Sequence, residues 1–82
     1  MRPKINKLEY KKDYIYKIQF TDNKEGEVNF QPFLWGQAFA SLKDKRMFRQ
    51  ASIDPTSGTI TWPSGVDIAP ETLYEKITAN LQ

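Results

Sequence analysis

The sequence predicts an α+β fold: two hairpins form a small antiparallel sheet, short helical turns lie between them, and a C-terminal helix packs on one face. Three observations predict this fold. Aromatic and apolar side chains alternate with period two in residues 14–30, as in strands with one buried face. Residues 51–62 repeat that alternation around a turn with proline and glycine. Beyond residue 70, apolar side chains recur at helical spacing.

The first predicted hairpin occupies residues 14–30, and polar turn formers at residues 21–26 reverse the chain within it. A further strand is expected at residues 5–10, before the polar link 11–13. Pro32 ends the pairing, because proline has no N–H to donate to a strand ladder. The inward face of the hairpin is expected to consist of Tyr14, Tyr16, Ile18, Phe20, Val28 and Phe30.

Short helical turns are expected between the hairpins. The apolar segment 33–36 predicts a turn or a short 3₁₀ segment, and residues 37–42 predict a short helix. Asp44 suits the N-cap of a second helical turn at residues 45–49, since a carboxylate there can accept a hydrogen bond from a backbone N–H. Phe48 is expected to anchor that turn to the core.

The second hairpin is predicted at residues 51–62. Residues 55–58 form its turn, because proline suits the first central position and glycine supplies a positive φ. Trp62 lies on the inward face of the returning strand. We expect it to be buried against the C-terminal helix, near Tyr74 or Ile77.

The final helix is predicted to begin at Pro70, whose missing N–H is not needed in a first helical turn, and to run to the C-terminus. Asp67 is expected to accept hydrogen bonds from backbone N–H groups at the helix start. Glu71 lies in the first turn, where an acid suits the positive end of the helix. The buried face of this helix is expected to carry Leu73, Tyr74, Ile77 and Leu81.

The composition excludes several classes of function. The 82 residues suit a single domain, 1–82, with a formal net charge of +2. Cysteine and histidine are absent, which excludes a disulfide, a thiolate metal site and a nucleophile activated by histidine within the chain. The carboxylates expected to lie close together, Asp67 and Glu71, suit helix electrostatics better than catalysis. We expect no catalytic residues, no metal, no cofactor and no enzyme.

Membrane insertion is also not indicated. The longest apolar runs have three residues, whereas a membrane helix needs about 20. No apolar stretch follows Arg2, so the N-terminus shows no signal peptide. We expect a cytoplasmic protein.

Trp35, Glu71 and Tyr74 are the candidate residues for binding a partner protein. Trp35 lies in an irregular segment flanked by proline and glycine, and tryptophan is frequent at the energetic centres of interfaces. Core and interface are about equally expected for it. Glu71 and Tyr74 follow the turn at residues 64–65 and are candidates for a binding edge on the final helix.

Nucleic acid is the alternative partner. The basic N-terminal third interleaves lysines with tyrosines, and cations beside aromatic rings bind single strands. Lys11, Lys12 and Lys17 are the candidate residues. Alternating aromatic side chains on a strand are nevertheless more typical of a core, so protein binding remains the leading hypothesis.

Three motifs lie at residues 33–36, 54–63 and 65–74, and the pattern Trp-Pro-x-Gly-x-Asp-Ile-x-Pro-x-x-Leu-Tyr begins at Trp62. Together they resemble a widespread family of small bacterial proteins catalogued only as a domain of unknown function. The resemblance covers roughly residues 5–76 and implies a compact α+β domain. Some relatives carry an added helix-turn-helix domain, and many are encoded beside another small protein. The resemblance thus implies a non-enzymatic interaction module that acts as an antitoxin-like partner of a protein encoded nearby.

Overall fold

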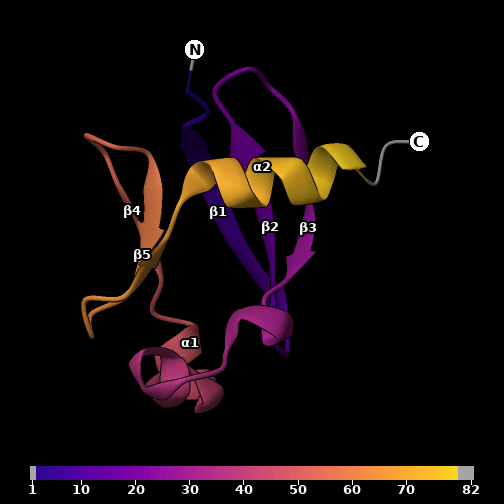
Figure 1. Cartoon of the computed structure of the whole chain (residues 1–82). Coiled ribbons are helices and arrows are strands. Elements are labelled where there is room, and N and C mark those ends of the chain that lie inside the picture. Colours follow the sequence, from indigo (N-terminus) through magenta and orange to yellow (C-terminus); the bar gives the residue numbers. More distant parts are fainter. Residues whose placement is uncertain (1, 80–82) are drawn as a thin grey trace.

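Two antiparallel sheets of three strands each form the framework of the computed structural model, which describes residues 2–79. The C-terminal helix crosses one face of the first sheet, the second sheet lies beside it, and the short helical segments lie at one end (Figure 1). The predicted α+β class is confirmed. The strands form two sheets rather than one, because the second hairpin meets β1 through a single backbone hydrogen bond of 2.9 Å, from Ile5 N to Gly58 O.

The first sheet consists of β1 (Ile5–Lys12), β2 (Ile15–Phe20) and β3 (Glu25–Asn29), in that order. The predicted hairpin and the strand before it are therefore confirmed. β1 carries two register shifts against β2, which explains why its apolar side chains break strict alternation. The predicted inward side chains are buried, except that Tyr14 is half-buried.

Three short helical segments follow: η1 (Gln31–Phe33) and η2 (Gln37–Lys43) are 3₁₀ helices, and α1 (Lys45–Phe48) is one α-helical turn. η1 begins two residues earlier than predicted, because Phe33 N donates to Phe30 O directly after β3. The predicted cap is confirmed, since the carboxylate of Asp44 accepts a hydrogen bond of 2.9 Å from Arg46 N.

The second sheet consists of β4 (Ser52–Asp54), β5 (Thr59–Thr61) and β6 (Asp67–Ile68). The hairpin of β4 and β5 is confirmed, whereas β6 is too short for periodicity to predict. Its presence makes the prediction for Asp67 wrong, because Asp67 pairs with Thr61 in the sheet instead of capping the helix. The helix begins only after the strand has ended.

The C-terminal helix α2 (Pro70–Ala79) lies across the first sheet, as predicted, and its own side chains Leu73 and Ile77 are buried. Gly26 of β3 allows this close approach. A Cβ atom at that position would lie 3.1 Å from Ile77 Cγ2. Leu81, which was expected on the same helix face, lies outside the described residues.

Trp62 is buried, with 2% of its surface exposed, which confirms the predicted burial. Its aromatic ring contacts are to Phe30 and Phe48 and not to Tyr74, one of its two predicted neighbours, which packs its ring on Phe20. The physical reason is the indole N–H, which needs an acceptor when buried and finds the carbonyl oxygen of Phe48 at 2.8 Å. Trp62 therefore joins the second sheet to α1.

Candidate functional site

Trp35 is the only exposed large hydrophobic side chain among residues 2–79, with 75% of its surface accessible. It lies between η1 and η2. Leu34, the preceding residue, takes the core position and is only 5% exposed. Gly36, the next residue, adopts a φ of 81°, which glycine accepts without strain and which starts η2 in a new direction. The local backbone thus directs one apolar side chain inward and the tryptophan outward.

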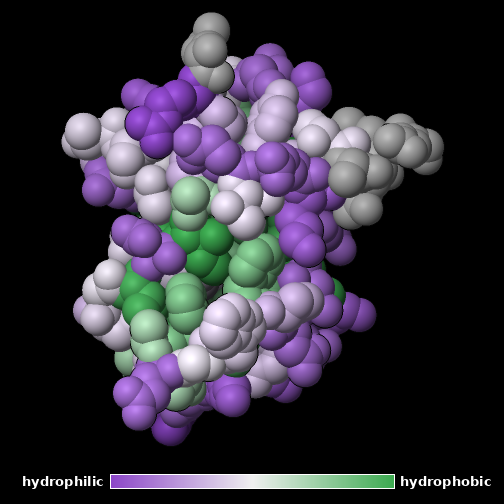
Figure 2. Space-filling model, in the orientation of Figure 1, coloured by the Kyte–Doolittle hydropathy of each residue, from purple (hydrophilic) through white to green (hydrophobic). Residues whose placement is uncertain are grey.

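A groove of about 420 Å³ lies beside Trp35, and we call it the tryptophan groove. The segments of η1 and η2 form one side, and β6 with the first turns of α2 forms the other. Figure 2 shows apolar side chains gathered in a hollow below α2, between this helix and the short helical segments. The apolar residues that line the groove include Phe33, Trp35, Phe39 and Ile68, and its polar lining includes Asp67 and Thr72.

Sequence patterns did not identify Phe39, Asp67 or Ile68 as parts of this groove. Phe39 lies in the short helix predicted at residues 37–42, but the sequence did not show which way its side chain points. The strand β6 was not predicted. Pairing of Asp67 and Ile68 with β5 is what brings them to the groove. The available signal was Ile68 itself, an apolar residue two positions before the proline that starts the helix.

Glu71 and Tyr74 do not line the tryptophan groove. They lie on another side of α2, where the Tyr74 hydroxyl donates a hydrogen bond of 2.6 Å to the carboxylate of Asp22 in the β2–β3 turn. Glu71 forms an ion pair of 3.0 Å with Arg2. Of the three residues proposed for partner binding, the structure therefore separates Trp35 from the other two.

The contacts of this second cluster shift several pKa values. The hydroxyl of Tyr74 lowers the pKa of Asp22, helped by the backbone N–H of Lys24, because both donate to the ionised carboxylate. The same bond raises the pKa of the Tyr74 hydroxyl. The pKa of Glu71 is lowered by its own backbone N–H and by Arg2. All three side chains thus take part in contacts that hold the β2–β3 turn and the N-terminal segment against α2.

The lysines of the alternative hypothesis do not form one cationic surface. Lys17 lies on the outer face of the first sheet and pairs with Glu25 at 3.5 Å. Lys11 pairs with Glu9 at 3.4 Å. Lys12 is exposed and has no ion pair within residues 2–79. The positive charges of Lys11 and Lys17 are therefore partly neutralised by acidic side chains of the same sheet.

Within the described part of the chain, no group of three or more carboxylates lies close enough to hold a metal ion. No helix among residues 2–79 is long and apolar enough to cross a membrane. Glu71 contacts Arg2, and Asp67 lies in β6, so the two carboxylates occupy different local settings.

One comparison with known proteins found a match, and it covers the fold described above. No curated protein and no solved structure matches the chain. A family model described as "Protein of unknown function (DUF2442)" matches residues 5–79. The match begins where β1 begins and ends where α2 ends, so it includes both sheets and the helix across them. The chain therefore belongs to the DUF2442 family.

Proposed function

We propose that this domain is a non-enzymatic protein-interaction module that binds its partner through the tryptophan groove. One observation carries the proposal: Trp35 is 75% exposed beside an apolar groove. An exposed tryptophan gains free energy when a partner covers it, at about 25 cal/mol for each Å² of apolar surface buried. Tryptophan is also among the residues that contribute most to binding at interfaces.

The groove favours a partner that presents apolar side chains next to a basic one. Phe33, Phe39 and Ile68 offer an apolar lining. Asp67 adds an exposed negative charge and has no ion pair within the described residues. A lysine or arginine of the partner can therefore meet Asp67 at the rim while an aliphatic or aromatic side chain enters the groove.

The resemblance to proteins encoded in pairs supports a more specific proposal. The partner is a small protein encoded beside this one, and the domain acts as its antitoxin-like counterpart by covering a functional surface. Glu71 and Tyr74 are secondary in this proposal, since both already make contacts within the chain.

The test is co-expression with the product of the neighbouring gene, followed by size-exclusion chromatography and a binding titration. The chain has two tryptophans, of which Trp62 is already buried, so a blue shift of the emission on binding reports on Trp35. We expect Trp35→Ala to weaken the complex about 30-fold or more, as for an interface residue worth about 2 kcal/mol. Lys7→Ala, on the outer face of the first sheet, is the matched control and leaves the affinity unchanged.

A charge variant tests the proposed basic side chain of the partner. Asp67→Lys places a positive charge at the rim of the groove, and we expect it to weaken binding most at low salt, where charges are screened least. Failure to form a complex with the neighbour's product, or a complex indifferent to Trp35→Ala, contradicts the proposal.

A further inference from the structure

The fold brings together two basic segments that are far apart in the sequence. The end of β1 carries Lys11 and Lys12, and the segment from the end of η2 to the residue after α1 carries four more cations. We call these six residues the cationic end; they are Lys11, Lys12, Lys43, Lys45, Arg46 and Arg49.

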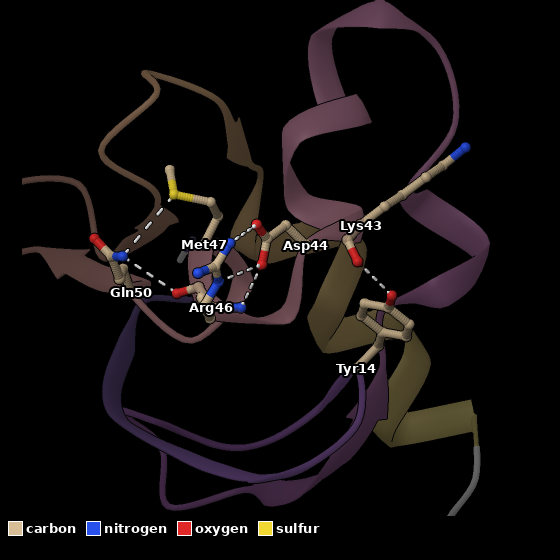
Figure 3. Close-up of polar contacts among 6 residues, drawn as sticks. All are labelled: Tyr14, Lys43, Asp44, Arg46, Met47 and Gln50. Atoms are coloured by element: carbon tan, nitrogen blue, oxygen red, sulfur yellow. Dashed lines mark hydrogen bonds and ion pairs between the residues drawn. The ribbon is translucent and has the colours of Figure 1, made fainter.

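Four contacts hold the two segments against each other. The hydroxyl of Tyr14 donates a hydrogen bond of 2.6 Å to Lys43 O (Figure 3). The ammonium group of Lys45 lies 3.5 Å from the carboxylate of Asp13 and 5.5 Å from the centre of the Tyr14 ring. The guanidinium of Arg49 lies 5.7 Å from the centre of the Tyr10 ring. These contacts place the cations of both segments on one surface.

The charges at this end are only partly neutralised. Lys11 pairs with Glu9, Lys45 with Asp13, and Arg46 with Asp44, whose carboxylate also caps α1. Lys12, Lys43 and Arg49 are exposed and have no acidic partner within residues 2–79. In Figure 3 the side chain of Lys43 extends away from the contacts that its backbone makes. Three positive charges thus remain available to a ligand.

We propose that the cationic end binds nucleic acid through the sugar-phosphate backbone. Trp35, the exposed large hydrophobic side chain, belongs to the tryptophan groove, so the cationic end has none of its own within residues 2–79. It therefore lacks the apolar anchor that a protein partner would use. Phosphate binding needs no such anchor, because neutralising phosphates releases counterions. α1 has only four residues and is too short to enter a groove of a duplex, so the binding does not depend on base sequence.

This surface differs from the one predicted from the sequence. Lys12 is retained, but Lys17 lies on the outer face of the first sheet beside Glu25 and does not take part. Lys43 and Arg49 replace it, because the contact between Tyr14 and the backbone of Lys43 brings the second basic segment to the first.

The experiment is a fluorescence anisotropy titration of the whole chain with a labelled DNA duplex of about 20 base pairs, at several salt concentrations. A single strand of the same length is titrated in parallel. We expect saturable binding at low salt that weakens steeply as salt rises. The variant combining Lys12→Gln, Lys43→Gln and Arg49→Gln should lower the slope of log K against log salt by about 0.9 for each phosphate that is no longer neutralised, and so by nearly 3 units on the duplex.

A matched control removes the same net charge elsewhere. Lys4→Gln, Lys7→Gln and Lys76→Gln together change three exposed lysines outside the cationic end, and we expect this variant to keep the slope of the parent chain. The variant with Lys12→Arg and Lys43→Arg retains the charges and should retain binding. Circular dichroism melts of each variant confirm that it is folded at the titration temperature.

Three outcomes overturn the proposal. The first is that the parent chain binds neither duplex nor single strand at low salt. The second is that the control variant loses as much binding as the cationic-end variant. The third is that poly-glutamate of equal charge binds the cationic end as tightly as the duplex does, which would assign the surface to an acidic protein.

Discussion

The indole Nε1 of Trp62 donates a hydrogen bond of 2.8 Å to the carbonyl oxygen of Phe48, and the two rings lie 5.9 Å apart. The same oxygen also accepts a hydrogen bond of 2.8 Å from the hydroxyl of Tyr16. Tyr16 belongs to β2 and Trp62 directly follows β5, so one buried carbonyl of α1 connects the two sheets. Leaving a buried backbone oxygen without its hydrogen-bond donors lowers the free energy of unfolding, because the oxygen has lost its water and gains no partner in return.

Trp62→Ala should strongly destabilise the domain. The change empties a fully packed site and removes one donor from the Phe48 carbonyl, and truncations of buried aromatic side chains typically cost about 3–5 kcal/mol. Small domains have only about 5–15 kcal/mol in total. Urea denaturation monitored by far-UV circular dichroism measures the loss. A midpoint close to that of the parent chain would show that the aromatic cluster around Phe48 does not hold the fold.

The two donors to Phe48 should be coupled. Tyr16→Phe keeps the ring and removes the hydroxyl, and we expect a cost of about 0.5–1.5 kcal/mol because the carbonyl still has Trp62. Trp62→Phe removes the other donor. The double variant leaves the buried oxygen with neither, so its loss should exceed the sum of the single losses. Strict additivity in a double-mutant cycle would contradict a shared acceptor.

Gly58→Ala should weaken the contact between the two sheets. A Cβ atom at this position would lie 2.4 Å from the Cβ of Lys4, and the φ of 68° already disfavours any side chain. Gly65→Ala is the control, because its φ of 95° imposes strain while no atom lies within 4 Å. Left-handed strain alone costs about 1–2 kcal/mol. Thermal melts should therefore show Gly58→Ala as the more destabilised variant, and equal losses would mean that the approach to Lys4 is unimportant.

The strands and turns with strong local signals were predictable from the sequence. Alternation along β2 and β3 identified their inward faces, and the turn before Gly58 identified the second hairpin, because each signal comes from a few adjacent residues. The cap at Asp44 was predictable for the same reason. The pairing of β5 with Asp67 and Ile68 was not, since two residues carry no periodicity.

The candidate sites depend on contacts between distant segments, and this limits what the sequence shows about them. Trp35 was identified from its irregular setting, but the far side of its groove comes from β6 and α2, which lie about 30 residues further along the chain. The cationic end likewise depends on the bond from the Tyr14 hydroxyl to Lys43 O, which joins residues 29 positions apart. Charge counts along the chain identified both basic segments without showing that they meet.

The bond between Tyr74 and Asp22 should make stability depend on pH at both extremes. The pKa of Asp22 is lowered from 3.8, chiefly by the Tyr74 hydroxyl. The hydrogen bond to the ionised Asp22 therefore contributes to the free energy of unfolding above that value, and this contribution is lost as the pH falls through the folded-state pKa. The pKa of Tyr74 is raised from 10.0, chiefly by its bond to Asp22. Its contribution is therefore complete below that value and is lost as the pH rises through the folded-state pKa.

Tyr74→Phe removes this bond while keeping the ring on Phe20. The difference in melting temperature between the parent chain and Tyr74→Phe should be constant between the two unshifted values, and it should shrink in acid and in alkali. Tyr10→Phe is the matched control in acid, because the Tyr10 hydroxyl donates to the backbone carbonyl of Asp13 and not to a carboxylate. Its effect on the melting temperature should not change as carboxylates become protonated. If both variants show the same loss of effect in acid, general acid destabilisation explains the result, and the Asp22 carboxylate is not the partner that makes the Tyr74 hydroxyl stabilising.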